Sequence, residues 1–254
     1  MKTAKTTPHS SSDRLEVSVP TSWQEISDDQ LLFVYRLLGE DVPTERVMMY
    51  AFLRFAGLHV LQKEAGGTVY IIRRGAAVYP VLRKDLVICA MRLEFIGQPS
   101  TFPVRLSHYK GCSAVNPDLR EFPFGHYLQV ENYFQAYLRY QTETCLAEIA
   151  ALLYPNYRGE VDKTLRYNLL AWLYGVKQYF ASEFPDLFCP AARNKDGEND
   201  WPDMKAITEA EIRALNGGDI TKTEAILAAD TWGALAELNA KAKEAVELER
   251  IRTK

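Results

Sequence analysis

The chain has 254 residues, of which 47% are hydrophobic and 25% charged, the composition of an ordinary globular protein with one or two domains. Its net charge of −3 argues against a dedicated nucleic-acid-binding protein, because such proteins carry a basic surplus. No apolar run is long enough to cross a bilayer, and the amino-terminal segment lacks the apolar core of a secretory signal. We therefore expect a cytoplasmic protein with no membrane partner.

Neither the first residues nor the cysteines are expected to stabilise the fold through regular structure or cross-links. Residues 1–14 are rich in Ser, Thr and Lys and poor in apolar side chains, so we expect a disordered arm. The four cysteines are far apart in sequence and form no CxxC pair, which indicates free thiols that pack as small apolar side chains. They are Cys89, Cys112, Cys145 and Cys189.

Two amphipathic helices are predicted next. Ser27 and Gln30 match an S-x-x-Q capping box in front of the apolar run LLFVYRLL, and Gly39 is expected to end that helix. A second helix is expected over residues 45–56, closed by Gly57.

Strand-like patterns begin at Leu58. The segments LHVLQ and TVYIIRR predict two strands joined by a turn at Gly66-Gly67, and a third extended segment, AVYPV, follows. Pro80 favours an edge position for that third strand. We thus predict a small β-hairpin or three-strand insertion at about residues 58–81.

A further helix over residues 84–95, ending at Gly97, is followed by a long irregular connection over residues 98–121. The segment from Phe122 to Pro155 is the most aromatic part of the chain and predicts one long helix or a helical hairpin. Some of its apolar residues recur at spacings of three and four and therefore share one helical face. They are Tyr127, Val130, Phe134, Tyr137 and Leu138.

The rest of the chain is also predicted to be helical. Thr164 is expected to cap a helix that ends before Pro185, and residues 189–204 are polar and predict a linker or surface loop. Residues 205–254 are expected to form the C-terminal helices, and two capping boxes mark where helices begin. The first of these helices is expected to end at Gly217-Gly218. These boxes are Thr208 with Glu211 and Thr221 with Glu224.

The fold class that follows is mainly α (α+β). We expect a bundle-like helical core over residues 15–188 with the small β insertion, and a long C-terminal helix. That last helix carries a narrow, Ala-rich apolar stripe around Trp232, Leu235 and Leu238, which is typical of packing on one neighbouring helix, in its own domain or in a partner.

No residue pattern predicts an active site or a cofactor. His108 and Cys112 have metal-ligand spacing but lack the further ligands that zinc needs. Pairs of Cys and His can be drawn, but no family signature surrounds any cysteine. The acidic alternation over residues 194–205 departs from a calcium loop at Asn199 and Lys205, where glycine and glutamate are required. We expect no enzyme, no metal and no small-molecule ligand.

The aromatic face has two interpretations, core packing and a protein-binding groove. Base stacking is disfavoured because Arg139 is the only Lys or Arg between Phe122 and Pro155, so nucleic acid is not expected. Under the groove interpretation the partner is a protein, and self-association is left open. The candidate partner-binding residues are Tyr127, Tyr133, Phe134, Tyr137, Tyr140, Trp232, Leu235 and Leu238.

Four blocks of sequence resemble an uncharacterised family of tail-module proteins from tailed phages and prophages. These blocks are VPTSWQEISDDQLLFVYRLL, PFGHYLQVENYFQAYL followed by LLYP, WLYGVKQYFASEFPDLF, and TWGALAELNAKAKE. The resemblance spans most of the chain, but it consists of helix-forming and aromatic residues and contains no catalytic signature.

The family is similar to the phage tail assembly chaperones, and this resemblance implies a mainly helical, non-enzymatic protein of the host bacterial cytoplasm. Such a protein would bind the long helical tape-measure protein before the tail tube assembles. A structural tail, connector or baseplate-associated subunit is the first alternative, and an enzyme with an unrecognised site is the second.

Overall fold

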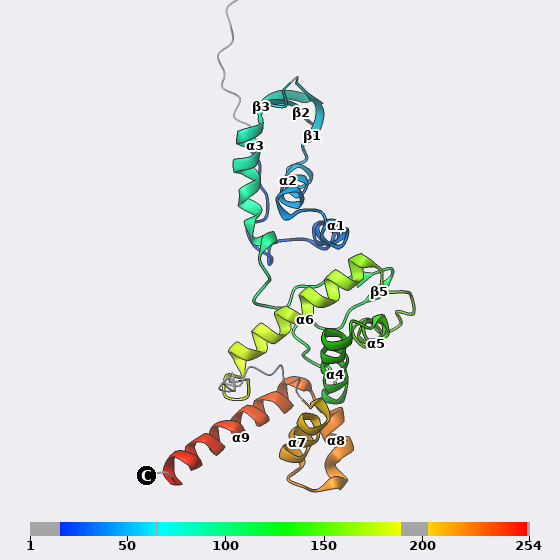
Figure 1. The fold of residues 1–254 in the computed structure, drawn as a ribbon, viewed down its shortest axis with the longest axis vertical. Coiled ribbons are helices and arrows are strands. Elements are labelled where there is room, and N and C mark those ends of the chain that lie inside the picture. The colour runs from blue at the N-terminus through cyan, green and yellow to red at the C-terminus, as the bar shows by residue number, and fades with distance from the viewer. Residues whose placement is uncertain (1–15, 65, 189–202, 253–254) are drawn as a thin grey trace, which may run out of the picture.

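The computed structural model of the chain describes residues 16–64, 66–188 and 203–252. The arm predicted over residues 1–14, Cys189 and most of the predicted loop at 189–204 lie outside these ranges. The described part is mainly helical with a three-stranded and a two-stranded antiparallel sheet, so the predicted fold class is confirmed. Figure 1 shows an elongated molecule, with the N-terminal elements at one end and the C-terminal helices at the other.

The N-terminal lobe, residues 16–97, contains the three-stranded sheet. The sheet has the order β1-β2-β3, so Pro80 lies in an edge strand, as predicted. The predicted capping box is also confirmed, because the Ser27 hydroxyl accepts from the Gln30 N–H while the Gln30 side chain accepts from the Ser27 N–H. The elements are α1 (Asp28–Gly39), α2 (Thr44–Phe55), β1 (His59–Lys63), β2 (Val69–Arg74), β3 (Ala77–Leu82), α3 (Arg83–Ala90) and the 3-10 helix η1 (Met91–Gly97).

The central part of the molecule resolves the aromatic segment into a helical hairpin. Its elements are β4 (His108–Tyr109), β5 (Cys112–Ser113), α4 (Phe124–Tyr140), α5 (Glu143–Leu153) and α6 (Lys163–Glu183). Gln141, with a φ of 53°, makes the turn between α4 and α5. The small β4–β5 hairpin was not predicted within the irregular connection.

The N-cap of α6 corrects one prediction. The Asp162 carboxylate, and not the Thr164 hydroxyl, accepts from the Leu165 N–H at 3.0 Å. Asp162 also accepts from the Tyr109 hydroxyl and pairs with Lys110 at 2.9 Å, so this cap joins α6 to the β4–β5 hairpin.

The C-terminal helices are α7 (Met204–Asn216), the 3-10 helix η2 (Ile220–Lys222), α8 (Thr223–Ala228) and α9 (Thr231–Arg252). Both predicted capping boxes are wrong, because Asp203 caps α7 and Asp219 caps η2. The predicted final helix is divided between Ala229 and Thr231. Backbone bonds cause this break: the Phe124 N–H donates to Ala229 at 2.8 Å, and the Thr231 N–H donates to Phe122 at 2.9 Å.

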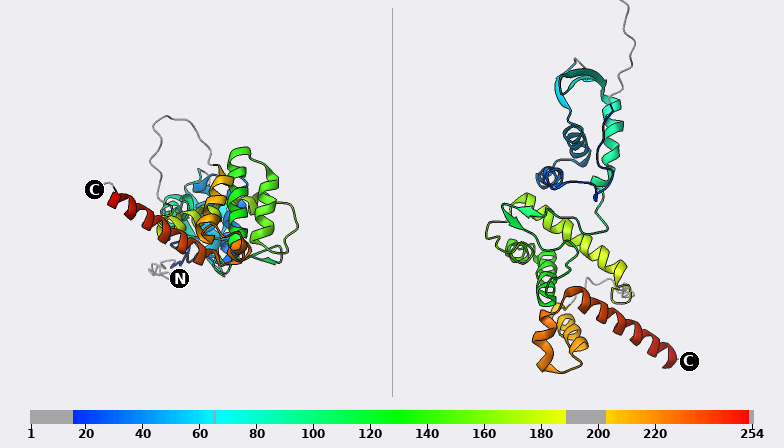
Figure 2. Two further views of the ribbon diagram at one scale, coloured as in Figure 1. Left: turned by 90° about the horizontal axis from the view of Figure 1, so that it is seen from below. Right: turned by 180° about the vertical axis from the view of Figure 1, so that it is seen from behind.

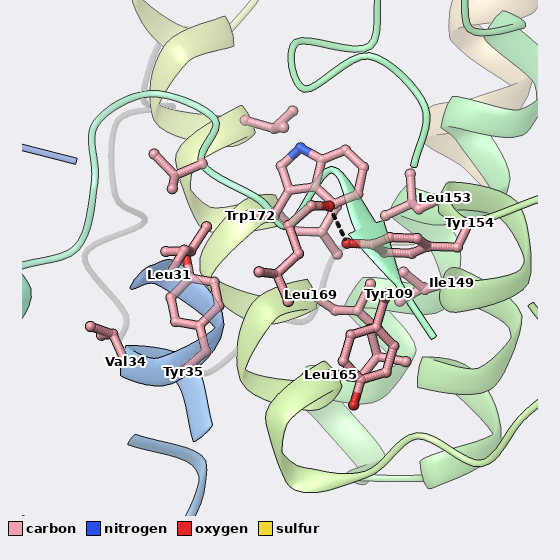
Figure 3. Close-up of a cluster of buried hydrophobic side chains, with 14 of the residues drawn as sticks. Leu31, Val34, Tyr35, Tyr109, Ile149, Leu153, Tyr154, Leu165, Leu169 and Trp172 are labelled. Carbon is pink, nitrogen blue, oxygen red and sulfur yellow. Dashed lines mark hydrogen bonds between the residues drawn. The ribbon is translucent and has the colours of Figure 1, made fainter. Parts of the chain in front are cut away.

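The core of the middle region joins α1, α5 and α6. Figure 3 shows Leu31, Val34 and Tyr35 of α1 facing the apolar side of α6, with Tyr154 and Trp172 packed beside them. A buried polar network lies within this cluster. The Asn168 amide oxygen accepts from the Leu106 N–H at 2.9 Å, and its nitrogen donates to the Tyr154 hydroxyl, which itself donates to the Leu106 carbonyl at 2.7 Å.

Two glycines mark the closest approaches to α6. A Cβ at Gly175, within α6, would lie 2.3 Å from the Phe102 carbonyl oxygen. A Cβ at Gly39, at the end of α1, would lie 2.8 Å from the Lys163 carbonyl oxygen. Because α1 packs on α6 in this way, it holds the N-terminal lobe to the rest of the molecule (Figure 2).

Candidate protein-binding groove

Most of the candidate residues from the aromatic and C-terminal stripes are buried within the chain. They are therefore no longer candidates for partner binding, because a side chain buried inside its own chain cannot contact another protein. On α4 these are Tyr127, Phe134 and Tyr137, and on α9 they are Leu235 and Leu238. For these five residues the core-packing interpretation holds.

Of the three remaining candidates, Tyr133 and Tyr140 lie on α4 and Trp232 lies on α9. Tyr140 is 63% exposed at the end of α4, and Tyr133 is half-buried. Trp232 is half-buried among Tyr179 and Phe184, and its indole N–H donates to the Asp118 carbonyl at 2.6 Å. Trp232 therefore anchors the start of α9 to the chain's own core.

The N-terminal lobe contains a groove with a volume of about 670 Å³. We call it the N-terminal groove. Its lining residues come mainly from the sheet, α2 and α3; Figure 1 shows the sheet across the top of the lobe and these two helices below it. It is lined by Glu45, Arg46, Met48, Met49, Tyr50, Leu53, Val60, Lys63, Tyr70, Arg83, Val87, Ala90 and Met91.

The lining follows from the helical period of α2. Val47, Ala51 and Phe52 are buried on the side of α2 that faces the lobe's core. Met48 and Met49 lie beside this face and are only half-buried, so they point into the groove. A helix whose core face is already filled thus presents a second apolar face that the lobe itself does not cover.

The α3 wall is apolar and open to solvent. Val87 of α3 is 43% exposed and Met91, the first residue of η1, is 56% exposed, although both are large apolar side chains. Three of the chain's five methionines line the groove. Methionine is flexible and polarisable, and it is favoured where one surface must fit different apolar partners. A contiguous exposed apolar surface of this kind is typical of an interaction site.

Catalytic or metal chemistry is not indicated in the groove. No three His, Cys, Asp or Glu side chains lie close enough to hold a metal ion anywhere in the described part of the chain. The groove is lined by one acidic residue, Glu45, and has no His or Cys. The lining therefore suits apolar contact with a ligand, with charged side chains also present.

Shifted titrations occur away from the groove. Burial and the nearby Glu131 carboxylate raise the pKa of Glu211, on α7, to about 7. Burial alone would raise the pKa of Asp162, but hydrogen bonds from Lys110 and Tyr109 lower it below its usual value. Both groups lie where elements pack together, which is the pattern of structural contacts.

With this geometry established, the chain was compared with known proteins. No family model matches it. No curated protein and no solved structure matches it either. None of the helices in the described ranges is both long and apolar enough to cross a membrane.

The sequence-based expectations did not include the N-terminal groove. One signal was present, the Met48-Met49 pair on a helix with an otherwise satisfied apolar face. A second was the apolar run over residues 86–91, in which Val87, Ile88 and Met91 are all exposed. The abundance of aromatic residues in α4 favoured a helix whose apolar face is mostly buried within the chain.

Proposed function

We propose that this protein is a non-enzymatic, chaperone-like protein that holds an apolar helical segment of a partner protein in the N-terminal groove. The observation that carries this proposal is the groove itself, an open apolar hollow of about 670 Å³ between two helices and a sheet. An amphipathic helix that lies in an apolar groove is one of the recurrent modes of protein recognition.

The partner in this proposal is the tape-measure protein of a phage tail, and the setting is the host bacterial cytoplasm during assembly. The resemblance of four sequence blocks to tail-module proteins supports this choice. A tape-measure protein exposes long apolar helical stripes before the tube forms around it, and such stripes aggregate unless they are covered. A groove lined by adaptable methionines suits a repeating stripe with varying side chains.

Co-expression with the tape-measure protein, followed by pull-down, tests the proposal. We expect a complex and a larger soluble fraction of the partner. Val87→Glu and Met91→Glu place a carboxylate in the groove and should each reduce capture strongly, because a charge must then be desolvated against an apolar stripe.

Ile88→Glu is the matched control. Ile88 is 63% exposed on the same helix as Val87 but does not line the groove, so its substitution should leave capture unchanged. Failure of the wild-type protein to form a complex or to keep the partner soluble would sink the proposal. An equal loss of capture with all three variants would show that the groove is not the binding surface.

A structural subunit of the particle is the second candidate. It is favoured by β1, an edge strand that pairs only with β2 among the described strands and whose five side chains are all exposed. Such an edge can pair with a strand of a neighbouring subunit. Mass spectrometry of purified particles separates the two: a chaperone is absent or depleted, whereas a subunit is present in stoichiometric copies.

A further inference from the structure

The segment of the N-terminal lobe that builds the groove has a basic surplus, although the whole chain is slightly acidic. Between residues 44 and 97 there are eight Lys or Arg and four Asp or Glu, whereas the whole chain has a net charge of −3. The basic residues of this segment are Arg46, Arg54, Lys63, Arg73, Arg74, Arg83, Lys84 and Arg92. The lining of the groove itself contains three of these basic residues, Arg46, Lys63 and Arg83, and one acidic residue, Glu45.

These basic side chains are not neutralised by the described part of the chain. The ion pairs found between described residues involve none of the eight. Arg54 lies over the ring of Phe33, Lys63 lies over the ring of Tyr70, and Arg74 donates to the backbone carbonyl of Glu16. Their contacts position the side chains but leave the charges unpaired.

The basic residues that line the groove lie at its two ends. Lys63 of β1 pairs with Tyr70 of β2, and the next residue of β2, Val69, pairs with Leu82 of β3. Arg83 directly follows Leu82, so Lys63 and Arg83 both lie at the sheet end of the groove. Arg46 lies in the first turn of α2. That turn is at the other end, because Thr44 contacts Gly97, the last residue of η1. Methionines occupy the space between.

We propose that the N-terminal groove selects a partner helix that carries acidic side chains at both ends of its apolar stripe. This inference rests on the proposed function and specifies the partner. Carboxylates at the ends of the helix would meet Lys63 and Arg83 at one end and Arg46 at the other, while the apolar stripe contacts Met48, Met49, Val87 and Met91. Glu45 partly offsets Arg46, so the sheet end contributes more to the selection.

A protein helix suits the lining better than a nucleic acid does. Single-stranded nucleic acids are held by aromatic rings that stack on successive bases. The groove has two aromatic side chains, Tyr50 and Tyr70, and its remaining apolar lining is aliphatic or methionine. Charged rims around an aliphatic floor set the orientation and the specificity of a helix.

Fluorescence anisotropy with the full-length protein and three labelled peptides tests the inference. The peptides share one helical apolar stripe of Leu and Ala and differ only in their flanks, which are Glu, Gln or Lys. We expect the Glu-flanked peptide to bind about five- to tenfold more tightly than the Gln-flanked one at low salt, since two or three exposed charge pairs each contribute modestly. The Lys-flanked peptide should bind most weakly, and added salt should reduce the differences.

The double variant Arg46→Glu with Arg83→Glu should reverse the order and favour the Lys-flanked peptide. The matched control is Lys84→Glu with Arg92→Glu, which makes the same change in net charge at exposed residues of the same lobe that do not line the groove. The control should keep the wild-type order of peptides. If the double variant fails to fold by circular dichroism, the wild-type peptide series decides alone.

The outcomes separate this inference from the proposed function. Equal affinities for the three peptides, with loss of all three in Met91→Glu, would overturn the charge selection and leave the helix-binding function standing. No binding of any peptide would count against both. Single-stranded DNA that displaces the Glu-flanked peptide and binds more tightly would overturn the inference in favour of a nucleic-acid partner.

Discussion

Asn168 is a buried polar side chain on which the core depends. It is fully buried in α6 and bridges the Leu106 backbone and the Tyr154 hydroxyl. Asn168→Ala leaves the Leu106 N–H without its partner, which should lower the free energy of unfolding by about 1–3 kcal/mol. Urea unfolding followed by circular dichroism measures the loss. Asn132→Ala on α4 is the control and should change stability by less than about 0.5 kcal/mol, and an equal loss there would contradict the assignment.

Glu211 makes the stability of the protein depend on pH. Burial and Glu131 raise its pKa from 4.5 to about 7 in the folded state, so the folded chain binds this proton over a pH range in which the unfolded chain has lost it. The free energy of unfolding should therefore fall as the pH rises from 4.5 to 7, by on the order of 1–2 kcal/mol from this group. Thermal unfolding across that range measures the slope.

Substitution tests the role of Glu211 directly. Glu211→Gln keeps the shape without the charge, so it should flatten the slope and raise the melting temperature at pH 8. Glu209→Gln is the control on the same helix, since Glu209 is exposed and faces Lys205 at 3.9 Å. Identical pH profiles for Glu211→Gln and the wild type would disprove this role.

Sequence alone predicts the core better than it predicts the surface at this scale. The spacing of Tyr127, Phe134 and Tyr137 placed them on one helical face, and all three are buried together. The same spacing could not distinguish a face that covers the core from one that binds a partner, because both need apolar side chains. Met48 and Met49 line the groove, but they are not aromatic, and the sequence-based prediction relied on aromatic residues.

At the scale of elements, α6 depends on a glycine. The Cβ of Gly175→Ala would lie 2.3 Å from the Phe102 carbonyl oxygen, so the segment at residue 102 must move away from the helix. We expect a loss of about 1–3 kcal/mol in the free energy of unfolding, despite the better helix propensity of alanine. Gly233→Ala in α9 is the control, because its Cβ would meet no atom within 4 Å, and it should be neutral or stabilising by up to about 1 kcal/mol. The same destabilisation at both positions would contradict the steric explanation.

Helix starts show why local patterns only partly predict elements. The Ser27 box is confirmed, because the side chains of Ser27 and Gln30 each accept from the other residue's N–H. The boxes proposed at Thr208 and Thr221 fail because Asp203 and Asp219, further towards the amino terminus, accept the first N–H groups. Aspartate is at least as good an N-cap as threonine. The break before α9 is set by backbone pairing with Phe122 and Phe124, which no local pattern encodes.

At the scale of the whole molecule, the three-stranded sheet is sparsely covered. Ile72 is the one fully buried side chain among the described residues of β1 to β3. Hydrogen exchange followed by mass spectrometry should therefore show faster exchange for peptides from residues 59–82 than for peptides from α6. Addition of a groove-binding peptide should slow exchange in α2 and α3 and leave α6 unchanged. Slower exchange in the sheet than in α6 would contradict this order of stability.

The N-terminal groove is built wholly from a continuous stretch, residues 45–91, and this fixes the order in which it appears during synthesis. A growing chain folds such local contacts early, since their loops are short. The groove can therefore be complete on the ribosome while α6, which covers the apolar face of α1, has still to emerge. A partner translated nearby would meet a finished groove on an unfinished protein, and capture could begin before the chain is released.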